Sequence, residues 1–335
     1  MGWTQLVESG LRFHLTEEEI LSLRPFYDRA DRELLAQAAK NFLGEFPQAE
    51  IEARYPDALD QARFGLLCVL VARPLLECHY QGHGYSESML DDISADTGAW
   101  VRTLKRDLHG DCGLPLKNLD WTRSCFRGNV LQFGRLQCSL NDLFRPKYSL
   151  YREKTGLKVL SFGEKGNPAS PALSWQDKCI NLHIPALGPL KRHACIDSIR
   201  RMTLFFAEFL PDYDYRAVVC CSWLLDPVLR GLLAPTSNIL AFQSLGHNWR
   251  WEEMDQTRNV LWRIWGDAGT EAGLGHIDRL EQKNSLQKSV ASYLKTGGRF
   301  TEGVLIIFRD ELSTLFRELE QTGCVQGISI YSSIN

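Results

Sequence analysis

The spacing of apolar residues changes once along this chain of 335 residues, and that change constrains its fold. The first 125 residues place apolar side chains at helical spacing, as in Ile93, Trp100 and Leu104. After about residue 126 apolar and polar residues alternate, and a period of two is typical of β-strands. The sequence therefore predicts an α+β chain, with a helical N-terminal domain at 1–125 and a mixed β-sheet flanked by helices at 126–335.

Composition excludes several classes of function. The formal net charge of -3 argues against a general polyanion binder, so we expect no nucleic-acid partner. No run of about 18 apolar residues occurs, so we expect no membrane span. The ten cysteines form no CxxC pair and the N-terminus has no signal-peptide pattern, which favours reduced thiols in a cytoplasmic protein.

The helical half carries no catalytic signature. Thr16 followed by three glutamates is a helix-start signal, and Pro74 should kink or end the long apolar segment around it. His79 and His83 stand four residues apart, a spacing that can chelate a metal on a helix. Glycines flank His83 and no third ligand is nearby, so a surface loop is favoured and no metal site is predicted.

The second half divides into short strands separated by turns. "FRGNVLQFGRLQCSL" alternates as a strand should, and "KYSLYREKTGLKVLSFG" is typical of a hairpin. Residues 163–172 are rich in Gly, Pro and Ser and predict a loop between strands. Further strands are expected in "DKCINLHIP", "YRAVVCCSWLLDP", "NILAFQ" and "GVLIIF".

A basic helix follows the strand "DKCINLHIP" after a proline-glycine turn. Helix N-termini bind anions because their first N–H groups lack intrahelical partners and the helix dipole is positive there. Lys191, Arg192 and His193 occupy the first turn, where acidic residues are usual. The segment is therefore either a phosphate site or a solvated surface turn. The apolar stripe of the same helix, from Cys195 to Phe209, predicts packing on the sheet.

Four stretches in sequence order resemble one known family. They are "FRGNVLQFGRLQ", "NLHIPALGPL", "DYDYRAVVCCSWLLDPVL" leading into "NILAFQ", and "SLQKSVASYLKTGG". With the helical first half, the chain resembles bacterial GNAT-like acyltransferases that join a helical N-acyltransferase N-terminal domain to a GNAT-like C-terminal domain. The resemblance implies an acyl-CoA donor whose thioester lies between two splayed parallel strands, residues 178–184 and 215–223.

The resemblance also implies where the donor binds. The expected donor-binding residues are Ile184, Leu187, Gly188, Leu190, Lys191 and Arg192. The chain departs from the usual [RQ]xxGx[GA] loop, because only Gly188 is present and Pro189 removes one N–H donor. The pantetheine arm of an acyl carrier protein is therefore an alternative donor.

Three residues are candidates for catalysis. His183 shares the polar face of its strand with Cys179 and Asn181, and a histidine can take the proton that an amine must lose before it attacks a thioester. The alternative is a core histidine. Cys221 is a candidate nucleophile for a covalent acyl-enzyme route. Adjacent Cys220 points to the opposite face of the strand, so at most one of the two cysteines lines a cleft.

Ser222 is the third candidate, since it shares a strand face with Arg216 and could line the cleft; a structural role is the alternative. Four tryptophans could stack on a ligand or cover an acyl tunnel, but a core role is preferred; they are Trp249, Trp251, Trp262 and Trp265.

The acceptor is expected to be an amine, because N-acylation is the activity that the resemblance implies. The helical half is a plausible surface for a larger partner, and two acidic groups, 17–19 and 91–92, could attract a Lys- or ornithine-bearing peptide or protein. A small-molecule amine is the alternative acceptor. A non-catalytic acyl-thioester-binding module is the alternative function.

Overall fold

The computed structural model describes residues 2–139, 148–153, 156–161, 171–174 and 177–321. The chain divides into two compact units by its contacts. Unit 1 takes Met1–Leu140, His183–Gly188 and Asp255–Phe300, and unit 2 takes Asn141–Leu182, Pro189–Met254 and Thr301–Asn335. A domain boundary near residue 125 stays a prediction.

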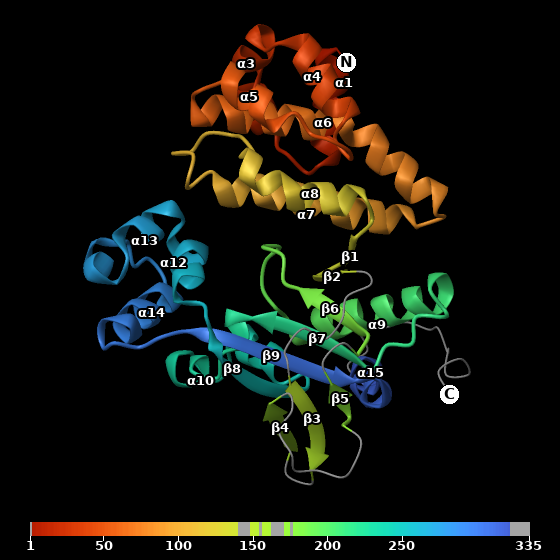
Figure 1. Ribbon diagram of the computed structural model, residues 1–335, viewed down its shortest axis with the longest axis vertical. Helices are drawn as coiled ribbons and strands as arrows, with labels where there is room; N and C mark the ends of the chain where they lie inside the picture. Colours follow the sequence, from red (N-terminus) through yellow and green to blue (C-terminus); the bar gives the residue numbers. More distant parts are fainter. Residues whose placement is uncertain (1, 140–147, 154–155, 162–170, 175–176, 322–335) are drawn as a thin grey trace. The chain divides into compact units, whose positions relative to one another are not determined.

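Unit 1 is mainly helical, as the red-to-yellow segments of Figure 1 show for its first group of helices. Its first group of helices is α1 (Trp3–Arg12), α2 (Glu17–Ser22), α3 (Arg24–Arg29), α4 (Arg32–Lys40), α5 (Gln48–Arg54), α6 (Ala58–Gly82), α7 (Glu87–Leu104), the short η1 (Leu116–Asn118) and α8 (Leu119–Phe126). Its second group is α12 (Thr257–Trp265), α13 (Asp267–Ala272), η3 (Leu274–Arg279) and α14 (Ser285–Lys295).

Helix α6 forms the centre of the first group and contacts α1, α4, α7 and α8. Its apolar residues are fully buried over several turns, among them Phe64, Leu67 and Leu70. Pro74 is expected from the sequence to kink or end this segment; the helix continues through Pro74 to Gly82, so the proline does not end it. Thr16 does cap α2: its hydroxyl accepts from the Glu19 N–H, and the Glu19 carboxylate accepts from the Thr16 N–H.

The strand expected from residue 126 onward is a hairpin of two strands. β1 (Val130–Phe133) pairs antiparallel with β2 (Leu136–Ser139), and Phe133 lies opposite Leu136. The connecting residues are Gly134 and Arg135, and Gly134 has φ 67°. A two-residue hairpin turn requires such positive φ, which glycine adopts without steric cost. This hairpin belongs to unit 1.

The tryptophans of α12 differ in their burial. Trp265 is buried, and its indole N–H donates to the Glu281 carbonyl at 2.6 Å, which agrees with the expected core role. Trp262 is half-buried beneath the guanidiniums of Arg106 and Arg263, whose carbons lie 5.3 and 5.0 Å from its ring centre.

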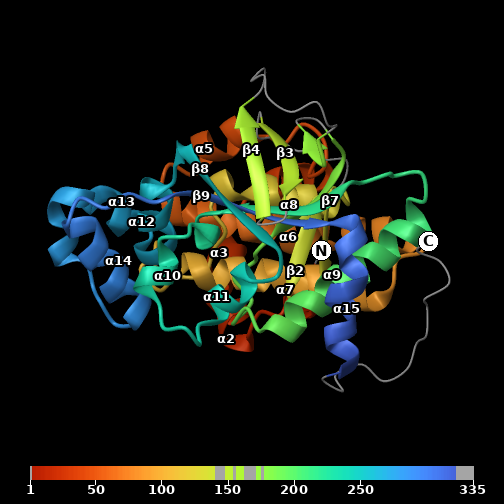
Figure 2. The same cartoon turned by 90° about the horizontal axis from the view of Figure 1, so that it is seen from below.

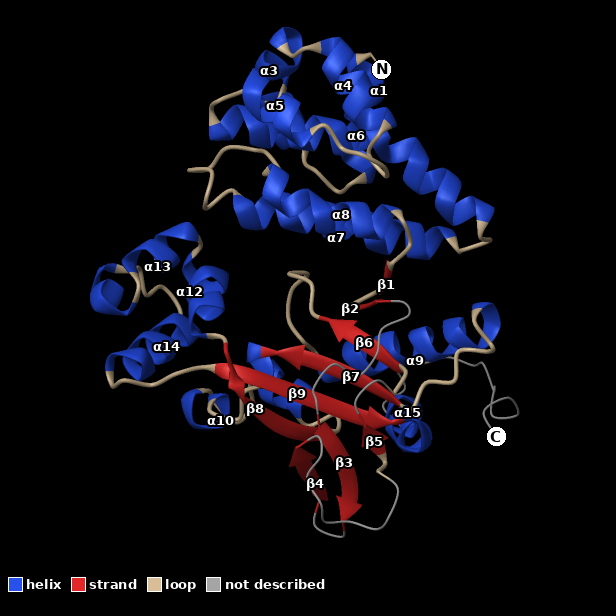
Figure 3. Ribbon diagram, viewed as in Figure 1, coloured by secondary structure: helices blue, strands red, loops and turns tan. Residues whose placement is uncertain are grey.

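Unit 2 contains two sheets, drawn in red in Figure 3. Its strands are β3 (Tyr148–Glu153), β4 (Gly156–Ser161), β5 (Leu173–Ser174), β6 (Cys179–His183), β7 (Ala217–Ser222), β8 (His247–Asp255) and β9 (Thr301–Phe308). The larger sheet runs in the order β6-β7-β9-β8, with β6 parallel to β7 and β7 antiparallel to β9. The smaller sheet has the order β4-β3-β5 and contains the expected hairpin. The mixed sheet of the predicted α+β fold is confirmed.

The helices of unit 2 are α9 (Arg192–Phe209), α10 (Leu229–Leu232), α11 (Asn238–Gln243) and α15 (Leu312–Gln321), with short η2 (Trp223–Leu225) and η4 (Arg309–Glu311). Helices α9 and α15 lie side by side, as Figure 2 shows from below. The stripe expected on α9 is buried at Cys195, Ile199, Met202 and Phe206 and half-buried at Phe209. The prediction that this stripe is core is confirmed.

The smaller sheet packs on the larger one through a sheet-face cluster. This cluster consists of Leu150, Leu173, Cys179, Ala217, Val219, Val304, Ile306 and Phe308. Trp249 and Trp251 of β8 pack against it, stacked 6.3 Å apart at 20°. These two tryptophans are therefore part of the packing between the two sheets.

Two expectations for this unit need correction. "NILAFQ" is helix α11 rather than a strand, because the Ser237 hydroxyl accepts from the Ile239 N–H and caps it. The strand β8 takes its place in the sheet. The hairpin turn at 154–155 and most of the expected loop at 163–172 lie outside the described residues. Among the described helices, none has the length and apolar character needed to cross a bilayer.

Candidate active site

The parallel pair β6–β7 sets the frame of the site. Its register runs from Cys179 opposite Ala217 to Leu182 opposite Cys220. β7 extends further along β9, to Ser222 opposite Gly303. Because partners in register share a sheet face, Asn181 lies on the face of β7 that carries Cys221. Ser222 lies on the other face.

His183 is the last residue of β6 and is half-buried. Its Nε2 is hydrogen-bonded to the hydroxyl of Ser139, the last residue of β2. The indole of Trp121, on α8, meets the imidazole edge-on, with ring centres 5.0 Å apart and planes at 84°. The imidazole is thus held by a polar contact and a packing contact, and all three residues belong to unit 1.

A buried carboxyl supports Trp121 from the side of α7. The Trp121 indole N–H donates to Asp96 Oδ2 at 3.3 Å. Asp96 is 3% exposed, and burial raises the pKa of its carboxyl to about 6, while hydrogen bonds from Gln137, Trp121 and Trp100 oppose that rise. The carboxyl therefore changes charge close to neutral pH.

The segment after His183 is bound to the β1–β2 turn. The Arg135 guanidinium donates to the carbonyls of Pro185 and Gly188, at 3.0 and 2.8 Å. Gly188 has φ 87° and is exposed. Of the expected donor-binding residues, Ile184 and Leu187 lie in this segment and are half-buried.

The start of α9 holds the other expected donor-binding residues. Leu190 is buried, while Lys191 precedes the helix with its side chain exposed. Arg192 makes a two-pronged ion pair with Glu318 of α15, at 2.9 and 2.8 Å, and also donates to Ser244. Its guanidinium therefore fastens α9 to neighbouring elements of unit 2. No acidic residue occupies the first turn.

The other catalytic candidates have different surroundings. The Ser222 hydroxyl accepts from the Leu224 N–H at 3.2 Å and caps η2. Cys221 is half-buried and packs against the sheet-face cluster. Cys220 is 1% exposed, and burial raises the pKa of its thiol well above the usual range, which disfavours the reactive thiolate.

Several acidic and histidine side chains named from the sequence have internal partners within unit 1. Glu19 is 4% exposed and pairs with Lys105 at 2.7 Å, and Asp92 accepts from the Gly134 N–H at 2.7 Å. His79 lies in the last turn of α6, whereas His83, whose flanking glycines predicted a surface loop, is exposed in the turn that follows; the two rings lie 4.3 Å apart. Among the residues that the structure describes, no group of three His, Cys, Asp or Glu is arranged to hold a metal.

No local sequence pattern singled out Ser139, Trp121, Asp96 or Arg135. Ser139 stands 44 residues before His183, and only the turn between β1 and β2 brings it there. The glycine at 134 was the available signal for that turn.

Comparison with known proteins identifies a family and a fold. The model of the GNAT-like C-terminal domain family matches residues 130–305. A mutant acyltransferase solved with octanoyl-CoA matches with a TM-score of 0.64 and 17% identity, covering 91% of this chain and 88% of that one. An acyltransferase in complex with decanoyl-CoA matches with a TM-score of 0.62 and 21% identity, covering 88% and 85%.

A third structure, an acyltransferase in complex with decanoyl-CoA and teicoplanin, matches with a TM-score of 0.63 and 18% identity and covers 89% of this chain and 86% of that one. At these identities the likeness establishes a shared fold over most of both chains. No curated protein sequence matches this chain.

Proposed function

This chain belongs to the GNAT-like C-terminal domain family and is an acyltransferase, and we propose that it transfers an acyl group from acyl-CoA to an amine. One observation carries the proposal. His183 ends a strand of the parallel pair, half-buried, with its ring held by Ser139 and Trp121. A fixed, partly open imidazole suits a general base that must work near neutral pH.

The reaction assigned to this site is direct transfer. His183 takes one proton from the protonated acceptor, either directly or through water. The neutral amine nitrogen then attacks the thioester carbonyl and the new C–N bond forms. The C–S bond breaks, CoA leaves as the thiolate, and the nitrogen gives its second proton to that thiolate, which yields the amide and the free CoA thiol. The matched structure that holds decanoyl-CoA and teicoplanin together supports this order, because direct transfer needs donor and acceptor bound at once.

We place the donor phosphates at residues 188–192. The first N–H groups of α9, an 18-residue helix without acids in its first turn, favour an anion. Lys191 supplies the exposed side-chain charge, whereas the Arg192 guanidinium is occupied by Glu318. The Arg192 contribution in this proposal therefore comes from its backbone N–H. An acyl carrier protein is the alternative donor, because its pantetheine arm has a single phosphate and so asks less of this phosphate site.

For the acceptor we propose a Lys- or ornithine-type side chain of a peptide or protein. Exposed Glu17 and Glu18 on α2 offer negative charge to such a partner. Because Glu19 pairs with Lys105 and Asp92 accepts from the Gly134 N–H, fewer acidic side chains are available to an acceptor than we expected from the sequence. A small-molecule amine is the competing acceptor.

The test is release of free CoA thiol from acyl-CoA of 2 to about 12 carbons, offered with lysine-bearing peptides and with matched free amines. We expect His183→Ala to lose about 10²-fold or more in kcat while donor binding survives. The control is His276→Ala, because His276 is exposed on η3 and has no assigned role. A folded His183→Ala protein that binds acyl-CoA and keeps its full rate at pH 7 would refute the role of His183. Donor binding without thiol release across the amine panel would favour a non-catalytic module.

The same panel decides the acceptor. Faster transfer to a lysine-bearing peptide than to free lysine or a short diamine supports the peptide acceptor. Equal or faster transfer to the free amines replaces it with a small-molecule acceptor.

A further inference from the structure

Ser139 is in direct contact with the residue proposed as the base. Its hydroxyl is hydrogen-bonded to His183 Nε2, and both side chains are half-buried. A hydroxyl both donates and accepts, so it can satisfy Nε2 whether or not that nitrogen carries a proton. The contact therefore suits a ring that changes its charge during a reaction cycle.

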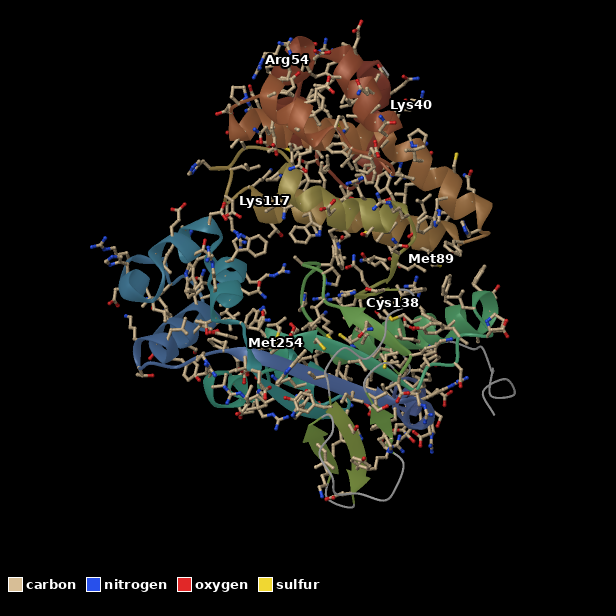
Figure 4. The ribbon with its side chains drawn as sticks, viewed as in Figure 1. Lys40, Arg54, Met89, Lys117, Cys138 and Met254 are labelled. Carbon is tan, nitrogen blue, oxygen red and sulfur yellow. The ribbon has the colours of Figure 1, made fainter. Side chains whose placement is uncertain are left out.

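The β1–β2 hairpin is built to present Ser139 rigidly. Ser139 lies opposite Val130 in the register, and the neighbouring residue Cys138, labelled in Figure 4, is fully buried. Further along the hairpin the buried amide of Gln137 donates to the side-chain oxygen of Gln132 at 2.9 Å. The pairing with Val130 and the buried neighbour Cys138 hold this end of β2 in place.

The hairpin turn is also fastened to the segments that flank the site. The Gly134 N–H donates to Asp92 of α7 at 2.7 Å. Arg135 donates to the carbonyls of Pro185 and Gly188, which follow His183 in the chain. One turn therefore joins the strand that carries Ser139 to the segment that begins with His183.

Trp121 closes the other side of the imidazole. Its ring meets His183 edge-on, and its indole N–H is held by buried Asp96. A ring packed only against Trp121 could still rotate. The hydroxyl at Nε2 is the polar contact that holds its orientation in both protonation states.

We propose that Ser139 is a positioning residue for His183: its hydroxyl holds the imidazole in the rotamer that accepts the proton of the amine. This inference rests on the proposed function of His183 as the base. It assigns Ser139 an action through His183 and no bond to the acyl group.

The test uses the full-length chain and compares Ser139→Ala, Ser139→Thr, His183→Ala and the double variant. Ser139→Ala should lower kcat by about 10- to 10²-fold with an unchanged KM for acyl-CoA, because a displaced base slows the chemical step and not donor binding. Ser139→Thr keeps the hydroxyl and should recover most of the rate. In the His183→Ala background the loss of Ser139 should have no further effect.

The matched control is Ser174→Ala, since the Ser174 hydroxyl donates to Asp177 in unit 2 and contacts no histidine in the described part of the chain. It should leave kcat unchanged. Full activity in Ser139→Ala overturns the proposal, and so does a further loss when Ser139→Ala is added to His183→Ala. Mass spectrometry after mixing with acyl-CoA gives a third outcome, because an acyl group on Ser139 would make it a nucleophile instead.

A readout without turnover separates this inference from the proposed function. The ring nitrogens of 15N-labelled histidine report tautomer and titration, and His183 is identified by its absence in His183→Gln. Ser139→Ala should change the His183 tautomer or its titration midpoint. An unchanged His183 spectrum refutes the positioning role even if the enzyme is active. A changed spectrum in a protein that releases no thiol sustains the contact and refutes the acyl-transfer function.

Discussion

Replacement of Asp96 by Asn should stabilise the protein at neutral pH, although it removes a buried hydrogen-bonding group. Asp96 is 3% exposed and accepts a hydrogen bond from the Trp121 indole. Burial raises the pKa of its carboxyl from 3.8 to about 6. At pH 7.5 the Asp96 carboxyl of the folded protein is therefore ionised, although its buried surroundings favour the neutral form.

The sign and the size follow from linkage between protonation and folding. A folded-state pKa above the unfolded value means that ionisation destabilises the fold above about pH 6, and the penalty fades as pH falls from 6 towards 4. A shift of about two units corresponds to about 3 kcal/mol, at about 1.4 kcal/mol per unit. Asparagine avoids this penalty but must place an NH2 group where a carboxylate oxygen accepted, which costs about 1 to 3 kcal/mol. The expected net gain at pH 7.5 is therefore up to about 2 kcal/mol.

The assay is urea unfolding of wild type and Asp96→Asn between pH 7.5 and 5, followed by tryptophan fluorescence and far-UV circular dichroism. The stability difference should favour the variant at pH 7.5 and shrink by about 1 kcal/mol at pH 5, where wild-type Asp96 becomes protonated. Asp120→Asn is the control, because the Asp120 side chain is 89% exposed and its ion pair with Arg123 lies at the surface. A variant that is less stable than wild type at pH 7.5, or whose advantage grows towards pH 5, would refute the reasoning.

Three other substitutions have defined outcomes. Cys221→Ser should keep kcat within about threefold in the thiol-release assay, and a loss beyond about 10²-fold together with an acyl-cysteine adduct in wild type would indicate a covalent route. Lys191→Glu should raise the KM for acyl-CoA at low salt and raise it less at high salt. It should leave the KM for an acyl-pantetheine without phosphates unchanged. An equal rise for both donors would show that the CoA phosphates do not bind at Lys191. Gly303→Ala should cost more than about 3 kcal/mol in urea unfolding, because its Cβ would lie 2.1 Å from the carbonyl carbon of Leu225, whereas Gly231→Ala meets no atom within 4 Å and should be tolerated.

Periodicity predicted the elements that bury one face and failed where a short segment is equally apolar in either conformation. The stripe of α9 and the strand that ends at His183 both follow from spacing. "NILAFQ" has six residues, too few for its period to separate helix from strand, and Ser237 decided the outcome as a cap. Pro74 was judged from its missing N–H, yet the surrounding helix is buried well enough to continue past it.

The sequence could predict the candidate base of the site but not the residues that contact it. His183 could be selected because its strand has one polar face, and face and period are local properties. The residues that hold it were not accessible, because Ser139 and Trp121 reach the imidazole through the β1–β2 turn and through α8 packing, which no local pattern encodes. The same holds for Arg192, whose charge suggested a phosphate although Glu318, 126 residues later, takes up its guanidinium.

The β1–β2 hairpin explains why the surroundings of His183 could not be predicted, because its turn determines which residues lie next to the imidazole. Had residues 130–139 formed one strand, Ser139 would extend about 30 Å from Val130, at about 3.3 Å per residue, instead of lying opposite it. The turn reverses the chain at Gly134, and Arg135 then reaches the carbonyls of Pro185 and Gly188, at the start of the expected phosphate loop. The feature that most defines the surroundings of His183 is therefore a two-residue turn. Its sequence signal is a single glycine within an otherwise regular alternation.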